Sequence, residues 1–171
     1  MIGKAKQRAE ALPEHWRILV VDSDEEIHRR IRSELGTIRF QDRGVEILDA
    51  YNEDEALALL EEHSDIAVAF VDMFLQVDHE GLELIRTIRQ RMGNSLLRII
   101  LRIDNSQNLS EAGIVIDYDI NDFMEKSEFQ GRKLAAAVIT GFRSYHDLRT
   151  ITDLNSFLEQ KVHDRTRALT D

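Results

Sequence analysis

The chain has 171 residues, enough for one domain with an extension, and 43% of them are apolar, enough for a core. The formal net charge of −10 disfavours nucleic acid and anionic membranes as direct partners, because phosphate contacts need clustered Lys and Arg. The absence of cysteine excludes disulfides, zinc–thiolate sites and thiol nucleophiles. The first 14 residues lack the apolar segment of a signal peptide, and no apolar run has the length of a membrane span, so we expect a cytoplasmic protein.

Five short apolar runs have the length and composition of buried strands. The first, RILVVD, ends on an acid, and the third, DIAVAFVD, also ends on an acid after an almost wholly apolar stretch. The predicted strands occupy residues 17–22, 45–51, 65–72, 96–103 and 120–124.

The segments between these runs have helical patterns. Ile27, Ile31 and Leu35 recur every four residues, and Asn52 with Glu55 makes a capping-box pattern at the start of a second helix. The predicted helices cover residues 24–36, 52–63, 80–93 and 108–118, and a long helical pattern runs from residue 127 onward.

Strands that alternate with helices predict an α/β fold with a five-stranded parallel sheet, doubly wound so that helices cover both faces. The first strand is followed by VDSDEE rather than by a Gly-rich phosphate loop, which argues against a nucleotide-binding Rossmann or P-loop protein. Sites in open parallel sheets form at the carboxyl ends of the strands. The residues at these ends are Asp22, Asp72, Ile103 and Lys126.

Two carboxylates and one lysine therefore converge at one edge of the predicted sheet. Asp22 and Asp72 would repel each other if both were ionised and desolvated, and Mg²⁺, which prefers oxygen ligands, would relieve that repulsion. Lys126 would pair with Asp72 or with a phosphoryl oxygen. An aspartate in such surroundings is a competent nucleophile toward phosphorus.

With these residues in place, the chain resembles a response-regulator receiver domain, the phosphoacceptor half of two-component signalling. The matching stretches span roughly residues 15–145 and are ILVVDSDEEI, DIAVAFVDMFLQVDHEGLELIRTIR, LRIILRI and YDINDFMEKSEF. The resemblance extends to receivers of larger multidomain signalling proteins that continue into a C-terminal coiled-coil linker.

The resemblance implies a flavodoxin-like fold and a switch domain that is not itself an enzyme. It implies that Asp72 accepts a phosphoryl group from a histidine kinase or phosphotransfer protein, assisted by Lys126. It also implies that Asp22, Asp72 and the backbone carbonyl of Phe74 are ligands of Mg²⁺.

Two residues depart from the pattern of the family. Ser23 stands where receivers usually carry a second acid, and its hydroxyl is a poorer Mg²⁺ ligand; with Glu26 it also fits a capping box for the first helix. Ile103 stands where the family places Thr or Ser, and it cannot donate the hydrogen bond of a hydroxyl to a phosphoryl group. A pseudo-receiver that docks or dimerises without phosphorylation is therefore the alternative function.

Two further patterns suggest other functions. The DSD sequence matches the opening acids of haloacid-dehalogenase-like phosphatases, but Glu26 and the lack of a suitable late acidic pair argue against that enzyme. HDLRTI resembles the phosphoacceptor box of a histidine kinase. No second helix or ATP-binding domain follows it in the sequence, so we expect His146 to be a solvated helix residue.

The C-terminal segment has a heptad pattern typical of a coiled coil. We divide the chain into an N-terminal extension (1–14), a receiver domain (15–145) and a helical linker (146–171) that leads toward an output domain and forms a homodimer. The alternative is an amphipathic helix that folds back on its own receiver. The predicted seam consists of Leu148, Ile151, Asn155, Leu158, Val162, Arg165 and Leu169.

Overall fold

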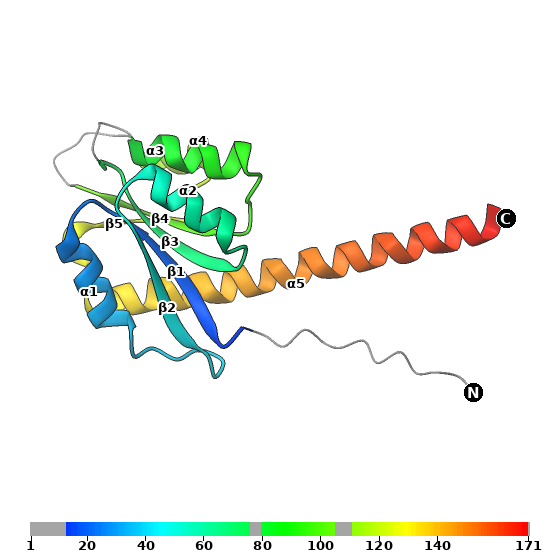
Figure 1. Cartoon of the computed structure of the whole chain (residues 1–171), viewed down its shortest axis with the longest axis horizontal. Coiled ribbons are helices and arrows are strands. Elements are labelled where there is room, and N and C mark those ends of the chain that lie inside the picture. The colour runs from blue at the N-terminus through cyan, green and yellow to red at the C-terminus, as the bar shows by residue number, and fades with distance from the viewer. Residues whose placement is uncertain (1–12, 76–79, 105–110, 171) are drawn as a thin grey trace.

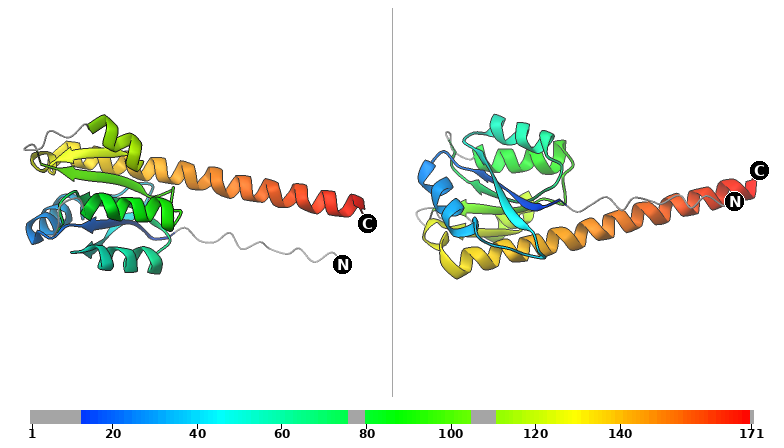
Figure 2. Two further views of the ribbon diagram at one scale, coloured as in Figure 1. Left: turned by 90° about the horizontal axis from the view of Figure 1, so that it is seen from above. Right: turned by 60° about the horizontal axis from the view of Figure 1, so that its bottom comes forward.

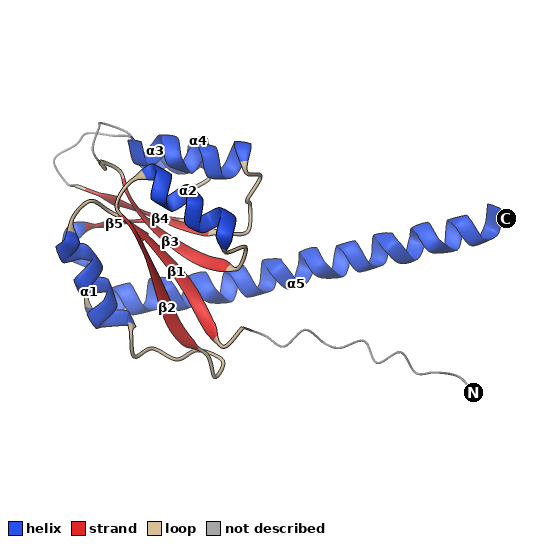
Figure 3. Ribbon diagram, in the orientation of Figure 1, coloured by secondary structure: helices blue, strands red, loops and turns tan. Residues whose placement is uncertain are grey.

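The computed structural model describes residues 13–75, 80–104 and 111–170. Its centre is a parallel sheet of five strands in the order β2-β1-β3-β4-β5 (Figure 3). The predicted doubly wound α/β fold is thereby confirmed. The strands are β1 (His15–Val21), β2 (Gly44–Ala50), β3 (Ile66–Asp72), β4 (Arg98–Ile103) and β5 (Asp122–Glu125).

Helices cover both faces of this sheet (Figure 1). The helices α1 (Glu25–Leu35) and α5 (Gly131–Thr170) pack on one face; α2 (Glu53–Glu62), α3 (Glu80–Arg86) and α4 (Glu111–Tyr118) pack on the other. Two short helical turns, η1 (Thr87–Arg91) and η2 (Lys126–Glu128), complete the described elements. Of these helices, none has both the length and the apolar character needed to cross a membrane.

The two faces of the sheet bury separate cores, and this explains the apolar runs in the sequence. Along β1, Ile18 and Val20 belong to the core with α1 and α5, whereas Leu19 and Val21 belong to the core with α2 and α3. All seven residues of β3 are buried. A parallel strand covered on both faces has no solvent side, so its sequence is continuously apolar until its last residue, Asp72.

Strand β1 begins two residues earlier than predicted, so Trp16 lies inside it. Its indole stacks on Phe142 of α5 with the ring centroids 4.9 Å apart, and its Nε1–H donates to the carbonyl of Phe40. His146 packs edge-on against the same indole and is half-buried. The expectation of a solvated His146 was wrong, because α5 turns this side chain toward β1.

The cap of α1 also differs from the prediction. Asp24 is the N-cap residue, and its carboxylate accepts a hydrogen bond from the backbone N–H of Glu26. The predicted capping box of Ser23 and Glu26 was wrong, since the Ser23 hydroxyl donates instead to the carbonyl of Leu75. In α2, Asn52 is the cap as predicted and accepts from the N–H of Glu55, but the Glu55 carboxylate accepts from the N–H of Tyr51 rather than from that of Asn52, so the capping box is only half formed.

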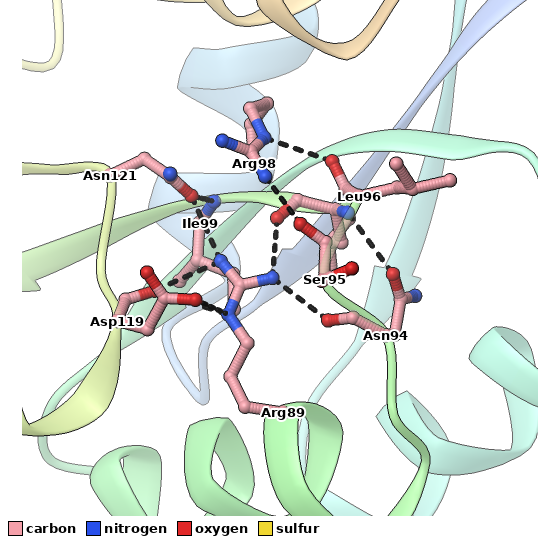
Figure 4. A network of polar contacts seen from close by, with 9 residues as sticks. Arg89, Asn94, Ser95, Leu96, Arg98, Ile99, Asp119 and Asn121 are labelled. Carbon is pink, nitrogen blue, oxygen red and sulfur yellow. Dashed lines mark hydrogen bonds and ion pairs between the residues drawn. The ribbon is translucent and has the colours of Figure 1, made fainter. Parts of the chain in front are cut away.

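The predicted helix 80–93 is divided, because its second half, η1, is π-helical. Arg89 of η1 lies with only 8% of its side chain exposed and donates hydrogen bonds to the carbonyls of Asn94, Leu97 and Asp119 and to the side chain of Asn121 (Figure 4). Burial lowers the pKa of Arg89 to about 10, so it stays charged at neutral pH. This guanidinium ties η1 to the segments that enter β4 and β5, at the edge of the sheet where those strands begin.

The start of α3 approaches the end of β3 closely at Gly81, and this contact yields a testable prediction. A Cβ at Gly81 would lie 1.9 Å from the backbone oxygen of Asp72, so Gly81→Ala must shift backbone and should lower the free energy of unfolding by about 2–3 kcal/mol. Gly93→Ala is the control, since Gly93 has a φ of +64° but open space around it, and should cost about 1 kcal/mol. Urea unfolding measures both; equal losses would contradict the steric explanation.

Candidate functional site

The register of three neighbouring strands brings three charged residues together at the carboxyl edge of the sheet. Val21 of β1 pairs with Val71 of β3, so Asp22 and Asp72 follow their strands side by side. Asp72 pairs in turn with Arg102 of β4, and the N–H of Met73 donates to the carbonyl of Arg102. The predicted pair of aspartates is thus adjacent, and Arg102 joins it.

Arg102 bridges the two aspartates. Its Nε donates to Oδ2 of Asp22 over 2.8 Å, and one of its terminal nitrogens donates to Oδ2 of Asp72 over 2.7 Å. The exposed fraction of the side chain is 10% for Arg102, 2% for Asp22 and 8% for Asp72. Sequence reasoning missed Arg102, although a charged residue near the end of an otherwise apolar strand was visible in LRIILRI.

The other oxygen of each aspartate accepts a backbone hydrogen bond. Oδ1 of Asp22 accepts from the N–H of Asp24 over 2.9 Å, and Oδ1 of Asp72 accepts from the N–H of Phe74 over 3.1 Å. All four carboxylate oxygens therefore have a donor. The loops after β1 and β3 hold the two carboxylates in fixed orientations.

The charge of Asp72 is nevertheless disfavoured. Burial and the neighbouring carboxylate of Asp22 raise the pKa of Asp72 to about 6, against the opposing effects of Arg102 and of the Phe74 N–H. One guanidinium therefore does not fully compensate the two buried carboxylates.

His28 fixes the backbone beneath this site and was not singled out by sequence reasoning. The imidazole is 2% exposed, with Nε2 2.8 Å from the carbonyl oxygen of Asp22 and Nδ1 2.7 Å from Oδ1 of Asp49. The ring also stacks on Tyr51.

Lys126 lies at the rim of the site, in η2 directly after β5. Its Nζ is 3.6 Å from Oδ2 of Asp24, and both side chains are about half exposed (52% and 41%). The lysine thus pairs with the cap of α1 in this structure. Ile103, the last residue of β4, is partly buried and presents an apolar side chain beside this edge.

The carboxylates of Asp22 and Asp72 are oxygen donors of the kind that Mg²⁺ prefers. The set is small, because Ser23 is neutral and the described residues contain no cluster of three acidic, His or Cys side chains suited to a metal. Arg102 already holds one oxygen of each carboxylate. The donors therefore fit the metal in kind, and the guanidinium of Arg102 lies among them.

A family model described as a response regulator receiver domain matches residues 18–139. The chain belongs to this family. It is therefore a receiver domain, a regulatory module of two-component signalling, as the sequence resemblance implied.

Individual relatives agree with this assignment. The chain is 36% identical over 140 residues to the 3′3′-cGAMP-specific phosphodiesterase 2 of Vibrio cholerae. The aligned region covers 82% of this chain but only 27% of that relative. It superposes on the receiver domain of an HD-domain protein from Pseudomonas fluorescens with a TM-score of 0.67, at 21% identity, covering 84% of this chain and 98% of that one. The receiver domain of NtrX from Brucella abortus gives a TM-score of 0.60 at 26% identity, covering 74% and 98%.

The raised pKa of Asp72 predicts a titration in the metal-free protein. The Phe74 amide donates to Asp72, so its NMR shift should change with a midpoint near pH 6, and this transition should be absent in Asp72→Asn. Because the native pKa lies above the unfolded value, the native state binds the extra proton. The stability linked to Asp72 is therefore present below the unfolded pKa and is lost as the pH rises through the native pKa. A midpoint at or below 4 would contradict the dominance of burial over the Arg102 contact.

Proposed function

We propose that this receiver domain accepts a phosphoryl group on Asp72 from a histidine kinase or phosphotransfer protein, in the cytoplasm. The observation that carries the proposal is the buried, adjacent pair of Asp22 and Asp72 at the carboxyl edge of a receiver sheet. The Phe74 N–H and Arg102 orient Asp72 through its two oxygens.

The reaction is a displacement at phosphorus. An oxygen of the Asp72 carboxylate forms a bond to phosphorus while the bond from phosphorus to the donor nitrogen of a phosphohistidine breaks. The electron pair of that bond stays on the imidazole, which takes a proton, and the product is an acyl phosphate on Asp72.

Charge compensation decides whether this step is favourable. Lys126 lies at the rim of the site, and its weak, exposed ion pair with Asp24 leaves it available to bind a phosphoryl oxygen. Asp22, Asp72 and the carbonyl of Phe74 would hold Mg²⁺, which supplies positive charge for the phosphoryl oxygens.

A second function, that of a pseudo-receiver acting only as a docking or dimerisation module, is favoured by a specific observation. Arg102 satisfies Asp22 and Asp72 without a metal, and Ile103 places no hydroxyl at the end of β4. Under this alternative, the charged cluster would be a permanent part of the fold.

Phosphorylation by a small phosphodonor tests the proposal. Incubation with acetyl phosphate and Mg²⁺ should add one phosphoryl group to the wild-type chain, as read by intact mass. Asp72→Asn should gain none, because an amide is not a nucleophile toward phosphorus. Lys126→Met should gain the group more slowly, by about 10–100-fold, because a charge that stabilises the transition state is lost.

The control for non-specific phosphorylation of other carboxylates is Asp104→Asn, because Asp104 is an exposed acid just beyond β4. This variant should be modified like the wild type. Equal modification of Asp72→Asn and the wild type, or no modification of either, would refute Asp72 as phosphoacceptor and favour the pseudo-receiver.

The proposal extends to α5 as the part that transmits the signal. We divide the chain into a receiver at residues 15–145 and a helical linker at 146–171, although α5 itself is one continuous helix from Gly131 to Thr170 (Figure 2). All residues from 151 to 170 are exposed. The large apolar side chains among them are Ile151, Leu154, Phe157, Leu158, Val162 and Leu169.

A second copy of this chain would cover that stripe as a parallel coiled coil. Four of the six exposed apolar residues lie on the predicted heptad seam, and Leu154 flanks it. The chain spans about a quarter of the length of the Vibrio phosphodiesterase that it matches.

Dimerisation should depend on the seam. Leu158→Glu combined with Val162→Glu should convert a dimer into a monomer in sedimentation equilibrium, because both charges would be buried at the interface. Ser156→Glu with Gln160→Glu adds the same charge on the other side of α5 and should leave the dimer intact. A monomeric wild type, or equal effects of the two double variants, would contradict the predicted seam.

A further inference from the structure

Arg102 differs from the other arginines of the described chain in holding two buried carboxylates at once. Its hydrogen bonds to Asp22 and Asp72 are 2.8 and 2.7 Å long, and both acids are almost fully buried. Arginine forms such bridges well, because its planar guanidinium presents several donors in a fixed arrangement. Each donor takes an oxygen that a divalent cation at this site would also need.

The backbone fixes this arrangement. Asp72 and Arg102 are register partners on β3 and β4, and the Met73 N–H is bonded to the carbonyl of Arg102. The guanidinium therefore starts from a strand position directly beside the acids. No loop movement is needed for it to reach them.

The electrostatics of the site limit what Arg102 can do. When both carboxylates are ionised, one guanidinium leaves a net negative charge in a buried place, which still favours a cation of higher charge. Asp24 is the next acid along the chain: a hydrogen bond from the Glu26 N–H lowers the pKa of its carboxyl most, and the charges of Lys126 and Arg102 add to this effect. Asp24 is partly exposed, so a guanidinium drawn toward it would remain solvated.

We infer that Arg102 is an internal competitor of the divalent cation, whose guanidinium must leave at least one of Asp22 and Asp72 before the metal binds. Arg102 thereby sets the metal affinity of the site and partly compensates the two acids when metal is absent. The inference rests on the metal site of the proposed function. It assigns to Arg102 a role that a fixed structural ion pair would not have.

Metal binding tests this role without phosphorylation. Mn²⁺ is the probe, and the free ion is counted by its EPR signal during titration of the full chain. Arg102→Met should bind Mn²⁺ more tightly than the wild type by on the order of tenfold or more, because two buried carboxylates then lack their cation. Arg98→Met is the matched control: it removes a guanidinium from the other end of β4, where Arg98 bonds the carbonyls of Leu96 and Ser95, and should leave the affinity unchanged.

A second measurement uses the wild type and does not depend on how well Arg102→Met folds. The Nε–H of Arg102 is hydrogen bonded to Asp22 and should give a distinct NMR signal in metal-free protein. Addition of Mg²⁺ should move this signal toward that of an exposed arginine, together with the amides of Asp24 and Phe74.

The outcomes separate the two proposals. Equal Mn²⁺ affinity in the wild type and Arg102→Met, or an unchanged Arg102 signal while the Phe74 amide responds to Mg²⁺, would overturn the competition and leave the metal site standing. If neither protein binds Mn²⁺ and no amide responds, the metal site fails, and the competition fails with it. Asp72 phosphorylation by acetyl phosphate reports separately on the phosphoacceptor.

Discussion

Two buried carboxylates that lie side by side require a cation, and this requirement governs the carboxyl edge of the sheet. Asp22 and Asp72 are adjacent because β1 and β3 are parallel and in register, and the apolar strands behind them exclude water. Burial raises the pKa of Asp72 even though Arg102 opposes that change. In the proposed function, this poorly solvated charge makes the Asp72 carboxylate reactive. The same charge destabilises the folded state unless a guanidinium or a metal lies beside the two carboxylates.

Much of this edge was predictable, because strand ends can be recognised in the sequence. Asp22 and Asp72 each end an apolar run, and parallel strands present their ends at one edge. Arg102 was missed because the run 96–103 was interpreted by its apolar residues alone. A buried arginine needs acceptors for its guanidinium, and the nearest acids at that edge were already identified. The sequence thus indicated the role of Arg102, but through a charged residue that interrupts an apolar run rather than through the run itself.

Other details depended on geometry that spacing does not report. Ser23 and Asp24 are both good N-cap residues, and only the path of the chain after β1 determines that Asp24 caps α1. The spacing of Leu82, Ile85 and Ile88 fits an α-helix, but the N–H of Met92 bonds the carbonyl of Thr87 and makes η1 a π-helical turn. Periodicity locates the buried face of a helix; it does not determine which carbonyl each N–H reaches.

The contacts of the rim connect the site to α5. Lys126 belongs to η2, the turn that precedes α5, and its ion pair with Asp24 joins that turn to the start of α1. At the other end of α1, the carboxylate of Glu34 accepts from the N–H of Gly131, the first residue of α5. A phosphoryl group that binds Lys126 would remove the first of these two links and leave the second. The proposed phosphorylation would therefore replace one weak, exposed contact between η2 and α1, while the apolar core holds the first turns of α5 to the sheet.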